Sequence, residues 1–315
     1  MNHARVLTPT HVIANPVAGS RNERRRFQHI VRQLGRGPAL ISWTRGPGDA
    51  TALTRYALRN GARLIVVVGG DGTLNEVVNG FFDEEGRIAP DATLLPLGGG
   101  TGSDFVRTLR KCGDEKDVGT GMERCAIDVM RVSYTTMDGR REARYAVNIA
   151  SAGLGGIVVR NLQASRSNLV HGPLSYFATI IRCLQTYDHD DVRIVADGRD
   201  LGVHRIRNIA VANARYFAGG LQIAPSAALD DGCLDVVILD DVPFRRLLRD
   251  VRNIYAGHHS DLPYIHSTRV RSVTLLPQQS SPVFLELDGE SVGCLPATID
   301  IVPSALNVHL PPRNT

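Results

Sequence analysis

The sequence contains no long apolar segment and few cysteines. No stretch approaches the roughly 20 apolar residues that a helix needs to span a bilayer, and residues 1–9 lack the apolar core of a secretory signal peptide. The five cysteines are scattered, odd in number and form no Cys-x-x-Cys pair. This usage favours a reducing compartment and argues against a cysteine metal cage. We therefore expect a cytoplasmic protein whose association with a membrane is at most peripheral and transient.

The sequence also lacks the common patterns of nucleic-acid binding. There is no zinc-finger spacing and no RNP-like aromatic motif, and the main arginine cluster, residues 21–26, is short. We therefore expect no nucleic acid among its partners. The chain has 36 Lys and Arg against 32 Asp and Glu, a formal net charge of +4. This mild excess suits anionic partners such as ATP or an acidic membrane surface.

The most informative segment is the sequence VVVGGDGTLNEVV at residues 66–78. An apolar, β-branched strand is followed by a glycine-rich turn that opens a helix, an arrangement that points backbone N–H groups and a helix dipole at an anion. Two well-known phosphate loops do not fit it. No lysine follows Gly70 or Gly72, as a Walker A loop requires, and Asn75 stands where the dinucleotide fingerprint has its third glycine.

An acidic residue, Asp71, lies inside this glycine turn. A carboxylate beside a polyphosphate is repelled unless a cation lies between them, so Asp71 indicates Mg²⁺ bound together with a nucleoside triphosphate. The alternative is that Asp71 only shapes the turn, because Asp and Gly are ordinary turn residues.

The first part of the chain alternates between strand-like and helical segments. Strands are expected at residues 11–15, 39–43, 64–68 and 93–97, and helices at 23–34, 50–59 and 74–82, with a short helix after Gly102. This alternation predicts a parallel sheet flanked by helices. Ligands bind at the carboxyl edge of such sheets, so residues 15–20, 69–73 and 98–102 should converge on one crevice.

Each of these three turns also places a hydroxyl three residues before a carboxylate, the spacing of a capping box. The pairs are Ser20 with Glu23, Thr73 with Glu76, and Thr101 with Asp104. Such pairs stabilise the start of a helix with or without a ligand, so capping alone is the alternative role for Ser20, Thr73, Glu76 and Asp104.

After residue 125 the pattern changes to strands without regular intervening helices. Strands are expected at 126–134, 144–150, 192–196, 206–213, 234–239 and 270–276, and helices at 174–184 and 244–255. The Asp-Gly pairs at 138–139 and 197–198 are typical of hairpins. We predict an α/β domain at 1–125 and a β-rich domain at 126–303, with the strand in 304–315 able to complete the first domain.

Two acidic groups in this second half suggest chemistry. Asp230, Asp231 and Asp235 surround a glycine turn and could supply the oxygen ligands of Mg²⁺ or Ca²⁺, although a solvated hairpin turn is the alternative. Asp288 ends a strand in which alternation places it on the same face as Phe284 and Glu286. It could project into an interdomain cleft and accept the proton of an alcohol that attacks a γ-phosphate, or it could be an ordinary hairpin residue.

Five motifs occur in one order along nearly the whole chain: NPVAG at 15–19, GGDGTLNEVVNG at 69–80, LGGGTGSDF at 97–105, DDGCLD at 230–235 and DGE at 288–290. Together they resemble the diacylglycerol kinase and sphingosine kinase superfamily, particularly its soluble bacterial lipid kinases. The resemblance implies an N-terminal α/β nucleotide-binding domain with a parallel sheet, a C-terminal antiparallel β-sandwich and an active site in the cleft between them.

The resemblance also implies roles for individual residues. It implies ATP binding by Asn15, Pro16, Gly19, Thr44, Gly69, Gly70, Asp71, Gly72, Thr73, Leu74, Asn75 and Thr101. It implies that Asp71 and Asp104, with Asp128, organise a catalytic Mg²⁺, and that Asp230, Asp231 and Asp235 hold a structural one. Asp288 would be the proton acceptor. The implied activity is ATP- and Mg²⁺-dependent phosphorylation of a free hydroxyl on a diacylglycerol-like lipid. The sequence does not give the oligomeric state and leaves a homodimer open.

Some alternatives stay open from the sequence alone. The apolar segment 169–184, with Arg160, Arg166 and Arg182 nearby, could face lipid or be a buried helix. An NAD kinase-like or sugar kinase would also use a Gly-Gly-Asp-Gly turn. A nucleotide- or lipid-binding regulator without activity is a third reading, because Ser103 stands where the family usually has Asn.

Overall fold

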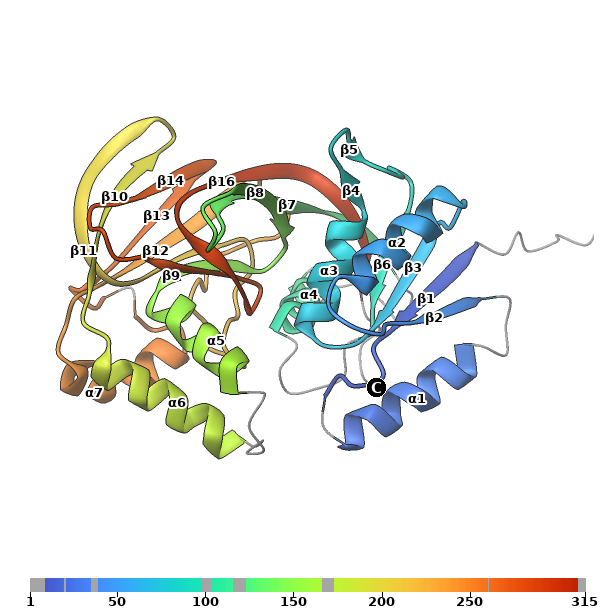
Figure 1. The fold of residues 1–315 in the computed structure, drawn as a ribbon, viewed down its shortest axis with the longest axis horizontal. Helices are drawn as coiled ribbons and strands as arrows, with labels where there is room; N and C mark the ends of the chain where they lie inside the picture. The colour runs from blue at the N-terminus through green and yellow to red at the C-terminus, as the bar shows by residue number, and fades with distance from the viewer. Residues whose placement is uncertain are drawn as a thin grey trace, which may run out of the picture. The chain divides into compact units, whose positions relative to one another are not determined.

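The structure is a computed structural model that describes residues 9–19, 21–34, 39–97, 104–115, 123–165, 173–259 and 261–310. The chain divides into two compact units (Figure 1). Unit 1 comprises Met1–Ile127 and Ser304–Thr315, and unit 2 comprises Asp128–Pro303. The chain passes from one unit to the other within two strands, β7 (Arg124–Thr135) and β16 (Glu290–His309).

Unit 1 contains a parallel sheet. Its strands run in the order β2 (Leu40–Trp43), β1 (Thr10–Ala14), β3 (Leu64–Val68) and β6 (Thr93–Pro96), and each neighbouring pair is parallel. The end of β16 adds a further parallel strand beside β6 through Asn307 and Val308. Strands β1, β3 and β6 are almost wholly buried apolar runs, the composition expected where helices cover both faces of a sheet.

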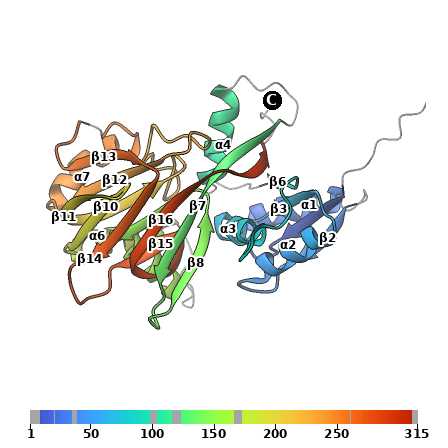
Figure 2. The same ribbon diagram turned by 90° about the horizontal axis from the view of Figure 1, so that it is seen from above.

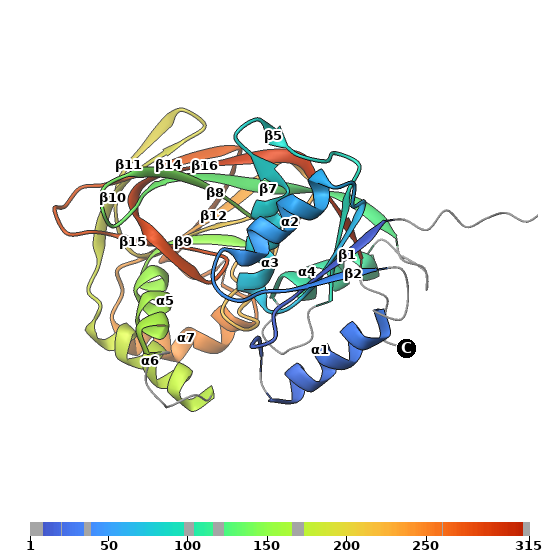
Figure 3. The same ribbon diagram turned by 45° about the vertical axis from the view of Figure 1, so that its right-hand side comes forward.

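Within the described part of unit 1, four helices accompany this sheet: α1 (Arg21–Leu34), α2 (Asp49–Arg59), α3 (Asp71–Gly80) and α4 (Asp104–Glu115). Helix α1 covers one face and α2 and α3 the opposite face (Figures 1 and 3). Helices α2 and α3 approach closely because Gly80 has no side chain, and a Cβ there would overlap the side chain of Thr54. A small hairpin of β4 (Phe82–Asp83) and β5 (Gly86–Arg87) follows α3. The helix after Gly102 is not short, since α4 has 12 residues.

Unit 2 is built from antiparallel strands. They are β7, β8 (Arg141–Ala146), β9 (Ile149–Gly153), β10 (Asp190–Ala196), β11 (Arg199–Ala212), β12 (Leu234–Asp240), β13 (Ile265–Val270), β14 (Ser272–Pro277), β15 (Phe284–Leu287) and β16. The first part of β11 pairs with β10 and its last part with β9 and β12, while β16 pairs first with β15 and then with β14. These shared strands curve the sheet, as Figure 2 shows from above, and a large cluster of buried apolar side chains comes from them.

The described residues of unit 2 form three helices, and one of them was not predicted. Helices α6 (Pro173–Thr186) and α7 (Phe244–Tyr255) match expected segments, whereas α5 (Leu154–Ser165) occurs where no helix was expected. After Leu154 its sequence continues with two glycines and three β-branched residues, which are poor helix formers. The glycines are explained by packing, because a Cβ on Gly155 would overlap Ser151 and one on Gly156 would overlap the carbonyl group of Phe284.

Two strands predicted as continuous are interrupted. The predicted strand 144–150 is divided between β8 and β9 by Val147 and Asn148, and the predicted strand 270–276 begins as the last residue of β13 and continues as β14 after Arg271. The first interruption matters for the candidate site, because it frees backbone N–H groups from the sheet.

The three helices of unit 2 lie on the same side of its strands (Figures 1 and 3). Leu184 of α6 packs against the same apolar cluster as Leu247 and Ile254 of α7. Among the described residues, no helix has both the length and the apolar character needed to cross a membrane.

Candidate active site

Three of the segments expected to bind nucleotide meet at the carboxyl edge of the sheet in unit 1. The amide of Thr44, after β2, donates a 2.9 Å hydrogen bond to the carbonyl of Ala14, and the amide of Asn15, after β1, donates one of 2.9 Å to Val68. The side-chain amide of Asn15 donates to the hydroxyl of Thr73 at 2.9 Å. The fourth segment, 98–103, which contains Thr101, lies outside the described residues.

The glycine turn itself consists of Gly69 and Gly70, and α3 begins directly after it at Asp71. The helix therefore starts three residues earlier than the sequence predicted. A Cβ on Gly69 would lie 2.7 Å from the Cβ of Thr73, so Gly69 is required for close packing. Gly70 is the N-cap residue, and a Cβ there would have nothing within 4 Å. The space at Gly70 is thus open at the N-terminus of α3, where the first backbone N–H groups could bind an anion.

Two of the predicted Mg²⁺ ligands open helices that follow neighbouring strands. Asp71 is the first residue of α3 and is partly exposed, while Asp104 is the first residue of α4, buried, and accepts a hydrogen bond of 3.1 Å from Nη1 of Arg107. A negative charge in the first turn of a helix is stabilised by the helix dipole. Strands β3 and β6, which precede the two helices along the chain, are neighbours in the sheet. Carboxylate oxygens are ligands that Mg²⁺ prefers, so these residue types fit the ion.

Glu76 does not form the predicted capping box with Thr73. The N-cap of α3 is Gly70, so Thr73 lies inside the helix rather than before it. The carboxylate of Glu76 instead accepts hydrogen bonds from the amides of Gly48 at 2.8 Å and Ala50 at 3.0 Å, at the start of α2. Glu76 thus caps a different helix and ties the loop that follows Thr44 to α3. No local spacing in the sequence indicates this partner.

A shallow hollow of about 310 Å³ lies beside this edge and is lined by Pro16, Gln28, Arg32 and Trp43. Trp43 is the only tryptophan of the chain and is 43% exposed at the end of β2, next to Thr44. An exposed indole next to this sheet edge is a surface on which a flat ring could stack. No motif in the sequence indicates Trp43 as a contact.

In unit 2, Asp288 is held by backbone amides. Its Oδ1 accepts hydrogen bonds from the amides of Asn148 at 3.0 Å and Ile149 at 3.1 Å, and its Oδ2 accepts one from Val147 at 3.0 Å. These donors are available because the chain between β8 and β9 leaves the regular ladder. Asp288 has a positive φ of 49° and is 7% exposed. Its carboxylate is therefore fixed in orientation by its own unit.

Two of the carboxylates in the turn at 230–235, those of Asp231 and Asp235, have protein partners. Asp231 forms an ion pair with Arg269 and accepts the amide of Cys233 at 3.0 Å, and Asp235 accepts the hydroxyl of Ser226 at 2.8 Å. Burial raises the pKa of Asp235. The guanidinium of Arg269 supplies the positive charge that a cation would bring. A structural Mg²⁺ held by Asp230, Asp231 and Asp235 stays a prediction, in which the ion would lie beside the guanidinium of Arg269.

Asp128 lies against the same turn. Its Oδ2 accepts the amide of Gly232 at 2.6 Å, and its own amide donates to the carbonyl of Leu229 at 2.6 Å. Asn213 connects it to the Asp288 region, because the side-chain amide of Asn213 donates to the carbonyls of Asp128 and Val147, each at 3.0 Å. In unit 2, Asp128 therefore joins the acidic turn to the loop that holds Asp288.

Comparison with known proteins agrees with this geometry. Residues 9–138 match the family described as the diacylglycerol kinase catalytic domain. Residues 148–310, just over half of the chain, match the YegS C-terminal NAD kinase beta sandwich-like domain. The chain belongs to the diacylglycerol kinase and sphingosine kinase superfamily. The glycine turn of unit 1 and the β-sandwich of unit 2 are thus the two parts of a superfamily member.

Curated relatives in this superfamily align over most of their length. A protein named diacylglycerol kinase from Staphylococcus carnosus is 28% identical over 305 residues, covering 95% of this chain and 94% of the relative. Another of that name from Mycobacterium tuberculosis is 28% identical over 293 residues, covering 90% and 88%. A crystal structure of a diacylglycerol kinase from Bacillus anthracis shares the fold, with a TM-score of 0.66, 22% identity and 96% of each chain covered.

One buried acidic residue near Asp288 was not among the predicted site residues. Glu286, two residues before Asp288, is completely buried, and its Oε2 accepts the amide of Gly289 at 2.9 Å. Among the described residues its Oε1 has no hydrogen-bond partner. Burial, with a smaller contribution from the charge of Asp288, raises the pKa of Glu286 to about 8. Burial thus favours the neutral form of Glu286, which lies two residues before the fixed carboxylate of Asp288.

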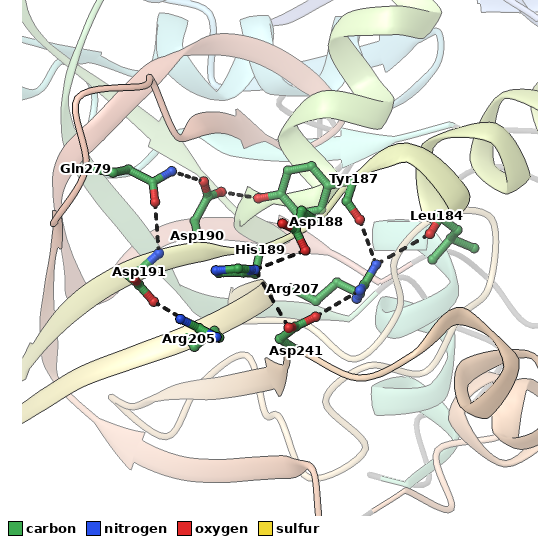
Figure 4. A network of polar contacts seen from close by, with 10 residues as sticks. All are labelled: Leu184, Tyr187, Asp188, His189, Asp190, Asp191, Arg205, Arg207, Asp241 and Gln279. Carbon is green, nitrogen blue, oxygen red and sulfur yellow. Dashed lines mark hydrogen bonds and ion pairs between the residues drawn. The ribbon is translucent and has the colours of Figure 1, made fainter.

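A second polar cluster joins the end of α6 to the strands (Figure 4). Ligand atoms of Asp188, His189 and Asp241 lie within 4.8 Å of one another, a spacing that a metal ion could bridge. However, Nη2 of Arg207 donates to Asp241 at 2.9 Å, and its Nη1 donates to the carbonyl of Tyr187 at 2.8 Å. The buried guanidinium balances the carboxylate without a metal. We interpret this cluster as the anchor of α6.

The segment expected to face lipid is only partly described. Arg166 and Leu169 lie outside the described residues, Arg182 is exposed, and Cys183 is buried. The guanidinium of Arg160 lies over the ring of Phe284, 4.1 Å from its centre. Arg160 thus covers β15, the strand that precedes Asp288, and a role of α6 in lipid binding stays a prediction.

Proposed function

We propose that this protein is an ATP- and Mg²⁺-dependent lipid kinase that transfers the γ-phosphate of ATP to a hydroxyl of a diacylglycerol-like lipid. The observation that carries this proposal is the open glycine turn at the start of α3, fixed by the hydrogen bond between Asn15 and Thr73. Curated relatives that align over nearly the whole chain are named diacylglycerol kinase, which supports the same acceptor class.

Unit 1 would bind the nucleotide. The phosphates would lie against the first turn of α3, where Gly70 leaves space for close approach of the backbone. Residues 15–19, Thr44 and residues 69–75 would line this position, and Thr101 is proposed from the motif alone. Asp71 and Asp104 would hold Mg²⁺, which when bound neutralises charge on the transferring phosphoryl group.

Unit 2 would supply the proton acceptor, Asp288. Three backbone amides hold its carboxylate in one orientation, so little reorganisation is needed when a substrate hydroxyl donates to it. Phosphoryl transfer passes through a loose transition state in which positioning contributes more than the strength of the base. A weakly basic but fixed carboxylate suits this role. An Asp288→Asn variant that retains wild-type turnover would remove Asp288 from the mechanism.

The lipid acceptor implies contact with a membrane surface. A diacylglycerol-like substrate resides in a bilayer, so the enzyme must associate with that surface at least transiently to reach it. This peripheral contact is part of the proposed function.

The acceptor can be identified by offering the protein different classes of substrate. Purified protein is incubated with γ-labelled ATP and Mg²⁺, together with a bacterial lipid extract, NAD⁺ or a mixture of sugars, and the products are separated by chromatography. We expect label in a lipid product only. Label in NADP⁺ or in a sugar phosphate would contradict the lipid assignment. Nucleotide binding without any labelled product would favour a regulator without activity.

A further inference from the structure

Helix α7 carries an apolar stripe that the core of unit 2 does not use. Leu248, Val251 and Tyr255 are 53%, 46% and 49% exposed. Their spacing of three and four residues places them in one row along the helix. The buried side of α7 is formed by other residues, since Leu247 and Ile254 pack into the apolar cluster. A single exposed apolar residue is ordinary, whereas three in a row on one helix indicate a contact surface.

Arginines border this stripe, and no exposed carboxylate of α7 offsets them. The helix contains Arg245, Arg246, Arg249 and Arg252, and its only acidic residue is Asp250. Asp250 accepts the hydroxyl of Tyr264 at 2.6 Å, and this hydrogen bond lowers its pKa. Arg249 pairs with Asp250, and Arg246 lies over the ring of Tyr264.

Arg245 and Arg252 are exposed, and within the described part of the chain neither has an acidic partner. On a helical projection they lie next to Leu248, so two uncompensated positive charges border the apolar row. A helix with an apolar row beside arginines is typical of segments that lie in the plane of a membrane interface.

We propose that α7 docks the protein on the surface of an anionic bilayer. Leu248, Val251 and Tyr255 enter the boundary between headgroups and acyl chains, and Arg245 and Arg252 contact the acidic headgroups. The choice of a lipid surface over an acidic protein rests on the proposed function. A second copy of the chain is disfavoured, because a symmetric contact through this surface would bring the arginines of both copies together.

The position of α7 in unit 2 supports this assignment. Helices α5, α6 and α7 lie on the same side of the strands, and α6 and α7 share one apolar cluster through Leu184 and Leu247 (Figure 3). Docking through α7 would therefore bring α6, the helix expected to face lipid, close to the bilayer.

The test measures binding of the full-length protein to vesicles by co-sedimentation. One set of vesicles contains phosphatidylcholine alone, and the other contains phosphatidylcholine with an equal amount of phosphatidylglycerol. One variant combines Arg245→Gln with Arg252→Gln, and a second combines Leu248→Ser with Val251→Ser. Matched controls in the same unit are Arg199→Gln and Val203→Ser, both at exposed positions of β11. Thermal unfolding of every variant should match the wild type.

We expect the wild type to bind the anionic vesicles more strongly than the neutral ones. Each arginine near an anionic surface should account for about fivefold in partitioning, so the double arginine variant should lose about 25-fold. This loss should shrink as salt is added, because the charges are exposed. The double apolar variant should lose binding to a similar degree, and both controls should bind as the wild type does.

The proposal is overturned if the wild type does not bind anionic vesicles, or if both α7 variants bind them like the controls. It is also overturned if the variants change only the oligomeric state, measured by light scattering, since a second copy would then be the partner. Kinase activity on a short-chain diacylglycerol dispersed in water separates this proposal from the proposed function. Vesicle binding that depends on α7, in a protein without that activity, contradicts the function and leaves the docking surface intact.

Discussion

The side-chain amide of Asn15 donates a hydrogen bond of 2.9 Å to the hydroxyl of Thr73, joining the loop after β1 to the first turn of α3. The two residues are 58 positions apart in the sequence and come from two of the recognised motifs. This hydrogen bond holds the two loops together, and the proposed phosphate site depends on it.

Removing the hydroxyl of Thr73 should weaken nucleotide binding. A Thr73→Val variant keeps the shape of the side chain but leaves the Asn15 amide without its acceptor, and a hydrogen bond of this kind is worth about 1 kcal/mol. We expect the KM for ATP to rise about fivefold in steady-state assays. Thr73→Ser retains the hydroxyl and serves as the control. A wild-type KM in Thr73→Val would show that this bond does not shape the site.

The two glycines of the turn should respond differently to alanine. Gly69→Ala places a Cβ against Thr73, and such overpacking should lower the free energy of unfolding by about 1–3 kcal/mol. Gly70→Ala meets no protein atom and has a negative φ that alanine tolerates, so its stability should stay close to that of the wild type. ATP binding by Gly70→Ala should nevertheless be weaker, because the methyl group occupies the proposed phosphate position. Chemical denaturation and calorimetric titration with ATP distinguish the two effects. Equal loss of stability in both variants would contradict this assignment.

Trp43 offers a direct optical signal for the nucleotide. As the only tryptophan, half-exposed beside Thr44, it should change its fluorescence when ATP binds. The change should saturate with ATP concentration and should be weaker at a given concentration in Gly70→Ala. A signal that does not respond to ATP, under conditions where calorimetry detects binding, would place the nucleotide away from the hollow beside Trp43.

Several elements could be predicted from the sequence because their signals are local. The strand and glycine turn at residues 64–70 follow from a run of β-branched residues that ends in two glycines, and α7 follows from its helical periodicity. Other elements depend on distant partners. The glycines of α5 are one example, because the strands beneath the helix leave no room for side chains at Gly155 and Gly156.

The site shows the same division between local and distant signals. The carboxylates Asp71 and Asp288 were recognised from their motifs, whereas the residues that surround them in the fold could not be predicted. Glu76 caps a helix that begins more than twenty positions earlier, and Asp288 binds amides about 140 positions earlier. The neutral state of Glu286 depends on burial that its alternating strand sequence does not reveal.

Stability should depend on pH through Glu286. Its pKa is raised to about 8 in the folded protein from an ordinary value near 4.5, so the folded state retains a proton that the unfolded state releases. The contribution of Glu286 to stability is therefore present in full below pH 4.5 and is lost as the pH rises from there towards about 8.

A Glu286→Gln variant should not lose stability in this way as the pH rises, because glutamine does not titrate. We expect its free energy of unfolding, measured in urea at a series of pH values, to exceed that of the wild type near pH 8 and to vary less with pH. Glu142→Gln, at an exposed position of β8, is the control. Parallel pH profiles for the wild type and Glu286→Gln would show that Glu286 does not titrate in this range.

In the proposed mechanism, Asp71 in the glycine turn holds the Mg²⁺ that supports transfer of the γ-phosphate of ATP to a lipid. The most direct measurement is the rate at which γ-labelled ATP labels diacylglycerol in the presence of Mg²⁺, compared between the wild type, Asp71→Asn and the exposed control Asp91→Asn. We predict a labelled lipid product from the wild type and from Asp91→Asn, and a rate at least about tenfold lower in Asp71→Asn because a Mg²⁺ ligand is lost. The absence of labelled lipid from the wild type, or equal rates in all three proteins, would contradict this mechanism.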